Sequence, residues 1–425
     1  MKTVYKNFIL LDGSKEMQAQ KNKLLVVENG VILDICDNFD FTDCRVIDLG
    51  GRYLMPGLIN LHVHLPAGGK FKKKKSDTKK LAKLIQANSL TRKLGVALCT
   101  GFAKTQLYSG VTTIRTVGGI ADFDTVLRDK INSGKVVGPR ILASNTAICP
   151  VDGHMEGTVA KVVTSVEECE KMVTELKNQN VDLIKLMITG GVLDAKVKGE
   201  PGILKMNSTL VKACTQTAHK LNLKVAAHVE SEKGVLVALE NEVDTIEHGS
   251  ALTNNMIELF KKNNSSYICT ISPALPLAKF DKDILGVDDT VIYNSNVVFD
   301  GVINGAKACL ENGITVGMGT DTGCPFITHY NMWRELHYFT KYLNVTPAFA
   351  LHTATLVNAK IAGVDNITGS IEKGKSADFL VVNDNPLEHF KNLSNPYMVV
   401  IKGKEIKCPK VKKYAFNDNL LDKYM

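Results

Sequence analysis

The stretch Leu54-Met-Pro-Gly-Leu-Ile-Asn-Leu-His62-Val63-His64 is an apolar run that ends in two histidines separated by one residue. Because side chains alternate along a strand, both imidazoles point to the same side and can reach one metal ion at the rim of a sheet. Two ordinary surface histidines would give the same pattern. Metal binding by this pair is therefore inferred only because further residues of ligand type recur along the chain at matching structural positions.

The length and composition of the chain limit the classes of protein to which it can belong. A chain of 425 residues can form one large α/β barrel with an accessory domain, or two or three ordinary domains. Its 44% hydrophobic and 23% charged residues are typical of a soluble globular protein. We find no signal peptide, no apolar stretch of transmembrane length and no CxxC pair among the ten cysteines. These features predict a cytoplasmic protein with reduced thiols and no membrane association.

Most of the net charge of +8 lies in one segment, Lys70–Lys83. This segment holds eight lysines and one aspartate, which gives +7 and leaves +1 for the rest of the chain. A single lysine run with one aromatic residue, Phe71, is typical of a solvated loop that leads into a helix. The distribution of charge therefore argues against nucleic-acid binding, and it assigns no role to the segment.

The middle of the chain alternates short β-branched runs with helical periodicity, as expected for an α/β fold. Helices are expected at 165–180, 207–222 and 254–263, with Ser165 and Asn207 as N-terminal caps. The strand candidates are 58–65, 111–117, 140–147, 182–188, 224–229, 245–248, 266–271 and 314–319. Eight strand–helix units in about 300 residues predict a (β/α)8 TIM barrel, with a doubly wound open sheet as the main rival.

The two ends of the chain differ from its middle. Residues 1–54 and the segment from 364 onward alternate in the manner of antiparallel strands. Neither end has enough strands to bury a sheet face by itself. We therefore predict one small composite β-sandwich domain made from residues 1–54 and 364–425, with the barrel at 55–363. The polar residues 410–425 are expected to be a peripheral tail.

Residues of ligand type follow several of the predicted strands, where TIM-barrel enzymes place their active sites. Each one alone has an ordinary explanation, such as a hydrogen-bonded core histidine or a helix-capping aspartate. Together they are six residues at five strand ends, which is an unlikely coincidence. The six residues are His62, His64, Lys185, His228, His248 and Asp321.

The chemistry of this set is coherent. Four neutral imidazoles and a carboxylate suit Zn²⁺, with Mn²⁺ or another first-row ion as an alternative. Lys185 is the odd member, because an ammonium group would be repelled by metal ions and is costly to bury. Its presence makes sense if the amine has reacted with CO₂ to form a carbamate, whose two oxygens can bridge two cations. The alternative is a lysine paired with a carboxylate.

On these residues the chain resembles the metal-dependent amidohydrolase superfamily over nearly its whole length. It is most similar to the branch of prolidases, or Xaa-Pro dipeptidases, and imidazolonepropionase-like proteins. Lys185 argues for the binuclear dipeptidase side, since imidazolonepropionase is mononuclear and lacks this lysine. Further matching stretches are 111–119, 138–140, 247–250 and the return to the β domain at 369–379.

The resemblance implies two divalent metal ions, with zinc expected. His62 and His64 would hold one ion together with Asp321, while His228 and His248 would hold the other. Carbamylated Lys185 and a hydroxide would bridge the two ions. The hydroxide would then attack an amide carbonyl, and Asp321 would act as general base and pass the proton to the departing amine.

The resemblance also suggests three substrate contacts. His154 lies in the loop after the third strand, where family members use a histidine to contact the substrate or the developing oxyanion. Arg115 could bind a substrate carboxylate, although a buried structural arginine is an equal alternative. His329, in the loop beyond Asp321, is a further candidate for substrate binding.

Three functions remain open from the sequence. The first is a binuclear metal-dependent hydrolase of peptide-type amides, a prolidase-like dipeptidase. The second is the same chemistry on a non-peptide substrate, such as an N-acyl amino acid, a cyclic amide, a urea or an ester. The third is a non-catalytic scaffold, which the six filled ligand positions disfavour. The expected partners are a small-molecule or dipeptide substrate and further copies of the chain in a homo-oligomer.

Overall fold

A computed structural model describes residues 1–72 and 77–425 of the chain, and its central element is the predicted barrel. Eight parallel strands follow one another around it in chain order, and each lies within one of the predicted ranges. The strands are β5 (Leu58–Val63), β6 (Val111–Thr116), β7 (Arg140–Leu142), β10 (Leu183–Met187), β11 (Lys224–Val229), β12 (Thr245–His248), β13 (Ser266–Cys269) and β14 (Val316–Met318). The doubly wound alternative is therefore wrong.

The third strand is shorter than predicted. The chain leaves β7 after Leu142, and Asn145 adopts a left-handed backbone with φ of 56°. The side chain of Asn145 accepts a hydrogen bond from the amide of Thr125 at 3.1 Å, which competes with regular strand pairing. The residues beyond it form β8 (Ala147–Cys149) and β9 (Ala160–Val162), which extend the sheet from β10.

Backbone hydrogen bonds connect the two sheets of the barrel at both of their margins. On one side the amide of Asp182 donates to the carbonyl of Ala143 at 2.8 Å. On the other side the amide of His64 donates to the carbonyl of Thr322 at 2.8 Å, next to Asp321. The second connection fixes the end of the first strand against the end of the last strand.

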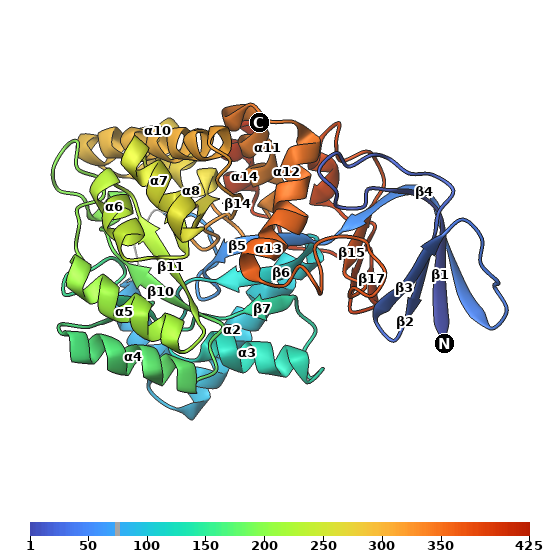
Figure 1. Cartoon of the computed structure of the whole chain (residues 1–425), viewed down its shortest axis with the longest axis horizontal. Helices are drawn as coiled ribbons and strands as arrows, with labels where there is room; N and C mark the ends of the chain where they lie inside the picture. The colour runs from blue at the N-terminus through green and yellow to red at the C-terminus, as the bar shows by residue number, and fades with distance from the viewer. Residues whose placement is uncertain (73–76) are drawn as a thin grey trace.

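Helices cover the outside of the barrel (Figure 1). The three predicted helices are confirmed, with Ser165 capping α4 and Asn207 capping α5. The segment from Lys70 leads into α1 as predicted, although its residues 73–76 lie outside the described part of the chain. The helices are α1 (Thr78–Gln86), α2 (Ser89–Tyr108), α3 (Phe123–Asn132), α4 (Val166–Asn178), α5 (Ser208–Lys220), α6 (Glu232–Glu240), α7 (Asn254–Asn263), α8 (Ile271–Lys279), α9 (Lys282–Leu285), α10 (Asp289–Glu311), α11 (Met332–Leu343), α12 (Pro347–His352), α13 (Asn358–Ala362) and α14 (Ala415–Leu421).

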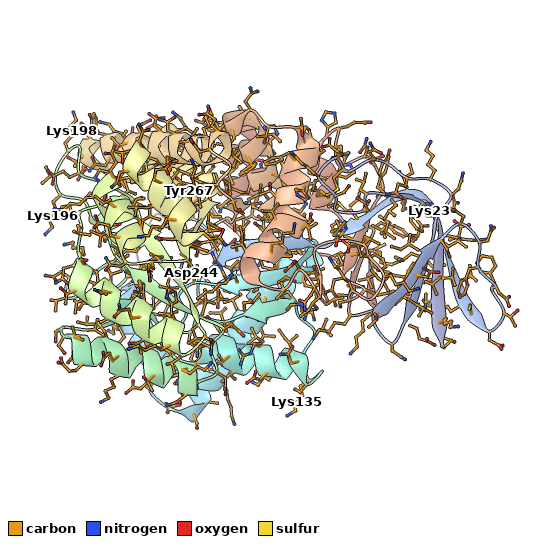
Figure 2. All side chains as sticks on the ribbon, in the orientation of Figure 1. Lys23, Lys135, Lys196, Lys198, Asp244 and Tyr267 are labelled. Carbon is orange, nitrogen blue, oxygen red and sulfur yellow. The ribbon has the colours of Figure 1, made fainter. Side chains whose placement is uncertain are left out.

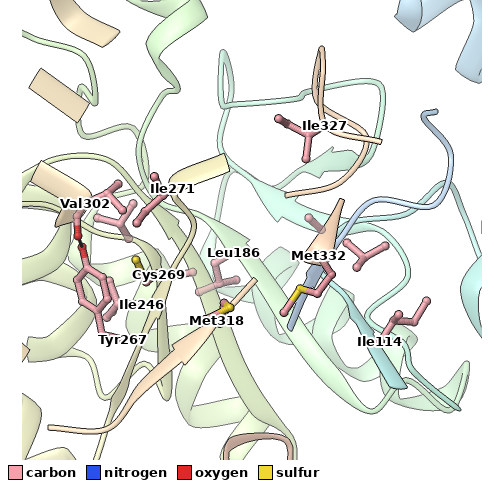
Figure 3. Close-up of a cluster of buried hydrophobic side chains, with 14 of the residues drawn as sticks. Ile114, Leu186, Ile246, Tyr267, Cys269, Ile271, Val302, Met318, Ile327 and Met332 are labelled. Carbon is pink, nitrogen blue, oxygen red and sulfur yellow. Dashed lines mark hydrogen bonds between the residues drawn. The ribbon is translucent and has the colours of Figure 1, made fainter. Parts of the chain in front are cut away.

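Strand alternation separates the helix-facing core from the interior of the barrel. Leu186 and Ile246 belong to the large apolar core, whereas their neighbours Lys185 and Glu247 are buried polar residues that face the opposite side. Figure 3 shows part of this core, where the hydroxyl of Tyr267 donates to the carbonyl of Val302 at 3.1 Å. Burial of so many aliphatic side chains supplies the main driving force for folding.

Strands from both ends of the chain form one mixed seven-stranded sheet, in the order β17-β16-β15-β4-β1-β2-β3. The hydroxyl of Tyr5 in β1 donates to Glu405 in β17 at 3.0 Å, although three strands lie between them, so the sheet folds over on itself. The two layers of the predicted sandwich are thus continuous. Its strands are β1 (Lys2–Leu10), β2 (Leu24–Glu28), β3 (Val31–Cys36), β4 (Cys44–Pro56), β15 (Phe379–Val382), β16 (Met398–Ile401) and β17 (Lys404–Lys407).

The C-terminal tail is packed against the barrel instead of being peripheral as predicted. Arg334 in α11, which is 3% exposed, pairs with Asp418 in α14 at 3.3 Å and with Asp422 at 2.5 Å. The side-chain amide of Asn417, also buried, donates to the carbonyl of Gly69 at 2.9 Å. Asn417 thus is a buried hydrogen-bonding partner, and Asp418 and Asp422 are the counter-charges of a buried arginine. A count of polar residues in the sequence cannot distinguish such residues from solvated ones.

Within the described part of the chain, none of the helices combines the length and the apolar character needed to cross a bilayer. All ten cysteines are free thiols, and six of them are buried.

Candidate functional site

The structure brings the six candidate ligands together at the C-terminal ends of the barrel strands. The ring centroids of His62 and His64 lie 5.3 Å apart, those of His62 and His248 lie 4.7 Å apart, and those of His228 and His248 lie 4.8 Å apart. Lys185 lies in β10, between the strands that carry these histidines, and Asp321 follows β14. Residues from five strands therefore converge on one buried centre.

Asp321 is the link between the histidines. Its Oδ1 lies 3.2 Å from Nε2 of His64 and 3.5 Å from Nε2 of His62, and it has no hydrogen-bond partner within residues 1–72 and 77–425. One ligand atom each of His62, His248 and Asp321 lie within 4.8 Å of one another. Two of these residues, His248 and Asp321, have left-handed backbones with φ of 65° and 53°, a conformation that is costly outside glycine and concentrates at functional sites.

A second set of groups orients the imidazoles. Nδ1 of His62 lies 2.8 Å from Oε2 of Glu247, and Nδ1 of His64 lies 2.8 Å from the carbonyl of Gly118. Nδ1 of His248 lies 2.7 Å from the hydroxyl of Thr270. Each contact occupies one ring nitrogen and leaves Nε2 for the centre of the site. Such outer contacts are the usual way in which proteins fix histidine ligands of metals.

Burial also sets the charge state of the imidazoles. It lowers the pKa of His62 to about 4, with Lys185 adding to the effect. Burial, followed by the neighbouring imidazoles, lowers the pKa values of His228 and His248 well below the ordinary range. These histidines are therefore neutral near pH 7, and the neutral imidazole is the form that binds metal ions.

Lys185 is buried among these groups. Its side chain is 1% exposed, and its Nζ has no hydrogen-bond partner in the described part of the chain. Burial lowers the pKa of this amine to about 8. The predicted alternative, an ammonium group paired directly with a carboxylate, is therefore not what the structure places here.

Close backbone approach shapes the site at two glycines. A Cβ atom on Gly319, directly before Thr320, would lie 2.5 Å from Cβ of His62. A Cβ atom on Gly191 would lie 2.6 Å from the ring of His154. Both distances are shorter than a side chain allows, so glycine at these positions lets the two histidines occupy their places.

His154 reaches the centre from the loop after β8, the short strand that follows the third barrel strand β7. Its ring stacks on His228 with centroids 4.3 Å apart and an interplanar angle of 9°. Its Nδ1 lies 2.5 Å from Oδ2 of Asp194, which fixes the orientation of the ring. The sequence reasoning missed Asp194, because it lies 40 residues further along, at the end of the 3-10 helix Val192–Asp194, whose place in the fold is not readable from composition.

The structure does not place the side chains of Arg115 and His329 where a substrate at the buried centre could contact them. Arg115 is 4% exposed and donates to the carbonyl of Leu61 at 2.7 Å and to Glu247 at 2.6 Å. The ring nitrogens of His329 contact the side chain of Gln106 at 3.3 Å and the carbonyl of Ala67 at 2.8 Å. Both side chains are thus committed to protein partners, which favours the structural reading of Arg115.

Glu247 is the main residue that the sequence reasoning overlooked. It is fully buried and contacts both His62 and Arg115. Burial alone would raise its pKa, but the guanidinium of Arg115 and then His62 outweigh this and lower the pKa well below its usual range. A lone glutamate and a lone arginine inside barrel strands need a partner of opposite charge, and this signal could have paired them.

Two adjoining cavities open beside the histidines. The smaller has a volume of about 90 Å³ and is lined by His154, His228, His248 and Asp321, among others. The larger has a volume of about 740 Å³ and shares Glu230 and Val298 with the smaller. Glu230 was also missed, and burial raises the pKa of its carboxyl group to about 8. The centre thus has space beside it for a small organic substrate.

Known proteins show the same architecture. A solved structure from Bifidobacterium longum, assigned as a prolidase, is 35% identical, covers 99% of this chain and 98% of its own, and has a TM-score of 0.87. A solved Xaa-Pro dipeptidase with bound methionine is 28% identical, covers 96% of this chain and 100% of its own, and has a TM-score of 0.83. An ochratoxinase from Aspergillus niger is 25% identical over 372 residues, which are 81% of this chain and 73% of the ochratoxinase.

The amidohydrolase family model matches residues 53–406, which span the barrel and most of the C-terminal strands. The match includes all four histidines, Lys185 and Asp321 of the buried centre. With this match, a barrel whose strand ends bring histidines and an aspartate together as a candidate metal site, and a 35% identical relative that matches over nearly the whole of both chains, the chain belongs to the amidohydrolase family and is a hydrolase of that family.

Proposed function

We propose that this chain hydrolyses a peptide-type amide bond in a small substrate, most simply a dipeptide. The observation that carries the proposal is the buried cluster of imidazoles around Asp321, which lines the smaller cavity where it adjoins the larger one of about 740 Å³. Likeness to a prolidase-type structure and to an Xaa-Pro dipeptidase supports the peptide bond as the target.

The donor set fits two divalent metal ions, and we expect zinc. Neutral imidazoles and carboxylates are its usual ligands, and Oδ1 of Asp321 and Nζ of Lys185 are buried atoms without hydrogen-bond partners in the described part of the chain. The holding residues would be His62, His64, Lys185, His228, His248 and Asp321. When bound, two such cations would supply an acidified water molecule and polarise the scissile carbonyl group.

Lys185 supports this proposal only in a modified form. An ammonium group at this position would repel divalent cations, and its Nζ has no acceptor in the described residues. Addition of CO₂ to the neutral amine, with loss of one proton, would form a carbamate whose single negative charge is shared by two ligand oxygens. The modified side chain would then bring negative charge to the centre instead of positive charge.

Asp321 and His154 have the positions needed for proton transfer and orientation. Asp321 reaches the centre from β14 and also lines the smaller cavity, so its carboxylate can take a proton at the reacting atoms and deliver it to the amine. Delivery matters because an amide nitrogen leaves poorly unless it is protonated. His154, held by Asp194 and stacked on His228, can hydrogen-bond to the substrate carbonyl.

A second candidate is the same chemistry on a non-peptide substrate, such as an N-acyl amino acid, a cyclic amide, a urea or an ester. The observation in its favour concerns the recognition of carboxylates, and it applies to the members of this class that have none, the cyclic amides, ureas and esters. Arg115 is occupied by Glu247, and in the described part of the chain no arginine lines either cavity. Likeness to an ochratoxinase agrees with a wider range of substrates in the family.

A substrate screen distinguishes these candidates. Protein loaded with zinc or manganese is tested against dipeptides varied at both residues, N-acyl amino acids, cyclic amides and esters. Hydrolysis of dipeptides supports the first candidate, and hydrolysis confined to the other classes supports the second. Full activity in protein stripped of metal by a chelator would contradict both.

Replacing Lys185 tests the binuclear centre. Lys185→Met is expected to reduce bound metal from two ions per chain to one or fewer, because the bridging ligand is lost while the buried volume is kept. Metal content after dialysis is measured by mass spectrometry. The matched control is Lys224→Met, at the opposite end of the neighbouring strand β11, which should keep both ions. Two ions retained in Lys185→Met would show that this side chain is not a ligand.

A further inference from the structure

Glu230 occupies the boundary between the two cavities. It lies two residues after His228, at the end of β11, and lines both the smaller cavity at the histidines and the larger one beside it. Its backbone is fixed, since its amide donates to the hydroxyl of Thr189 at 3.1 Å and its carbonyl packs against Gly202. A group that reaches from the reacting centre into the larger cavity must therefore pass this carboxyl group.

One oxygen of the Glu230 carboxyl group has no partner in the described part of the chain. Its Oε2 is buried and has no hydrogen-bond partner within residues 1–72 and 77–425, while the backbone of Val192 hydrogen-bonds to the same carboxyl group. A buried acceptor normally has a hydrogen-bond donor or a cation as its partner. In a group that faces a cavity, the missing partner can be part of the substrate.

The charged residues that line the larger cavity are mainly acidic. Besides Glu230 its lining contains Glu200, Glu232 and Asp300, against one cation, Lys233, although the whole chain has a net charge of +8. The lysines of the neighbouring loop do not offset these acids. Lys196 and Lys198 are exposed at the outer edge of the molecule (Figure 2), and Nζ of Lys198 lies 4.6 Å from the centre of the Tyr293 ring.

We propose that Glu230 is a specificity-determining residue that selects substrates with a cationic group, an ammonium or a guanidinium, in the part that occupies the larger cavity. The proposal rests on the proposed function, because it assigns the substrate class of the same site. Glu230 then provides a charge-assisted hydrogen bond at the entrance to the centre, and the outer acids add long-range attraction. A dipeptide with a basic residue is the simplest substrate of this class.

Arginine and citrulline form a matched pair for the test, since citrulline has nearly the same shape but no charge. The substrates are the dipeptides Ala-Arg and Ala-citrulline, and the reversed pair Arg-Ala and citrulline-Ala, with metal-loaded protein. In at least one pair the arginine substrate is expected to have a kcat/KM about 10- to 100-fold higher, the range of a hydrogen bond to a charged group. Glu230→Gln should bring this ratio close to one.

The control variant is Glu258→Gln, on the outer helix α7, which removes one negative charge from an exposed position and should keep the ratio. A calorimetric comparison of free arginine and free citrulline binding uses the same proteins and does not depend on turnover. The parent should bind arginine more tightly by a similar factor, and Glu230→Gln should not.

The outcomes separate this inference from the proposed function. Equal kcat/KM values and equal affinities for arginine and citrulline compounds in the parent would overturn the role of Glu230, while any hydrolysis would leave the proposed function intact. An arginine preference that survives in Glu230→Gln would also overturn it. If no amide is hydrolysed, the proposed function fails, and the binding comparison still decides whether the cavity selects a cation through Glu230.

Discussion

Asp321→Asn is expected to lower kcat by about 10³-fold or more while the protein remains folded. General acid–base groups typically contribute about 10²- to 10⁴-fold, and this residue also links His62 and His64 through Oδ1. An amide keeps the size of the carboxylate but cannot accept a proton and return it. Steady-state kinetics on the best substrate of the screen, together with bound metal and thermal unfolding, measure the effect.

Asp244→Asn is the matched control for this variant. Asp244 precedes β12, at the opposite end of the barrel, where its carboxylate contacts Nε2 of His219 at 2.9 Å and accepts from the amide of Val225 at 2.8 Å. It should lower stability but keep kcat within about threefold of the parent. If Asp321→Asn retains both its metal and a parental kcat, Asp321 does not transfer the proton.

Glu247→Gln is expected to lower the free energy of unfolding by about 3–5 kcal/mol, the usual cost of removing one partner from a buried ion pair. The guanidinium of Arg115 would remain buried, 5% exposed, without a counter-charge, and His62 would lose its charged acceptor. Chemical denaturation of the metal-free protein measures the change. Arg115→Met should cost a similar amount, and the double variant should cost less than the sum of the two.

The control for Glu247→Gln is Glu258→Gln. Glu258 pairs with Lys261 at 3.2 Å, its side chain is 72% exposed, and an ion pair of this kind is worth about 0–1 kcal/mol. Should Glu247→Gln cost no more than Glu258→Gln, the buried pair does not stabilise the barrel. The ordering of the two costs is therefore the informative result.

The Glu247 pair also predicts a direction of pH dependence. Arg115 and His62 lower the pKa of Glu247 despite its burial, so the native state keeps this carboxylate ionised at pH values where the unfolded chain binds a proton. The stabilisation is complete above the unfolded-state pKa of about 4.3 and decreases as the pH falls below it. The difference in unfolding free energy between the parent and Glu247→Gln should therefore shrink below about pH 4.

Much of the fold was predictable because its determinants are local. Alternating β-branched runs, helical periodicity and the caps at Ser165 and Asn207 are short-range signals, and each was confirmed. The interruption at Asn145 and the docking of Asn417 depend on hydrogen bonds to residues far away in the sequence. Local patterns contain no information about such partners, so these two features were not predictable.

The same distinction between local signals and contacts of distant residues applies to the functional site. His62, His228 and Asp321 could be predicted to converge because parallel strands of a barrel all end at one rim. The contact between Glu247 and Arg115 requires knowledge of which interior positions of β6 and β12 face each other, and the positions of Asp194 and Glu230 depend on the paths of loops. The sequence therefore predicts the class of reaction much better than it predicts the substrate.

The sheet that combines strands from both ends of the chain cannot be completed until synthesis of the chain is nearly finished. Pro56 of β4 pairs with Phe379 of β15, so 323 residues separate partners in one hydrogen-bonded ladder. During vectorial synthesis β1–β4 leave the ribosome first and must wait, with an unpaired edge, until the whole barrel has been made. Contacts of such high sequence separation form slowly and late, and the exposed edge can pair with other chains in the meantime. The nascent N-terminal strands are therefore where we expect chaperones to act on this protein.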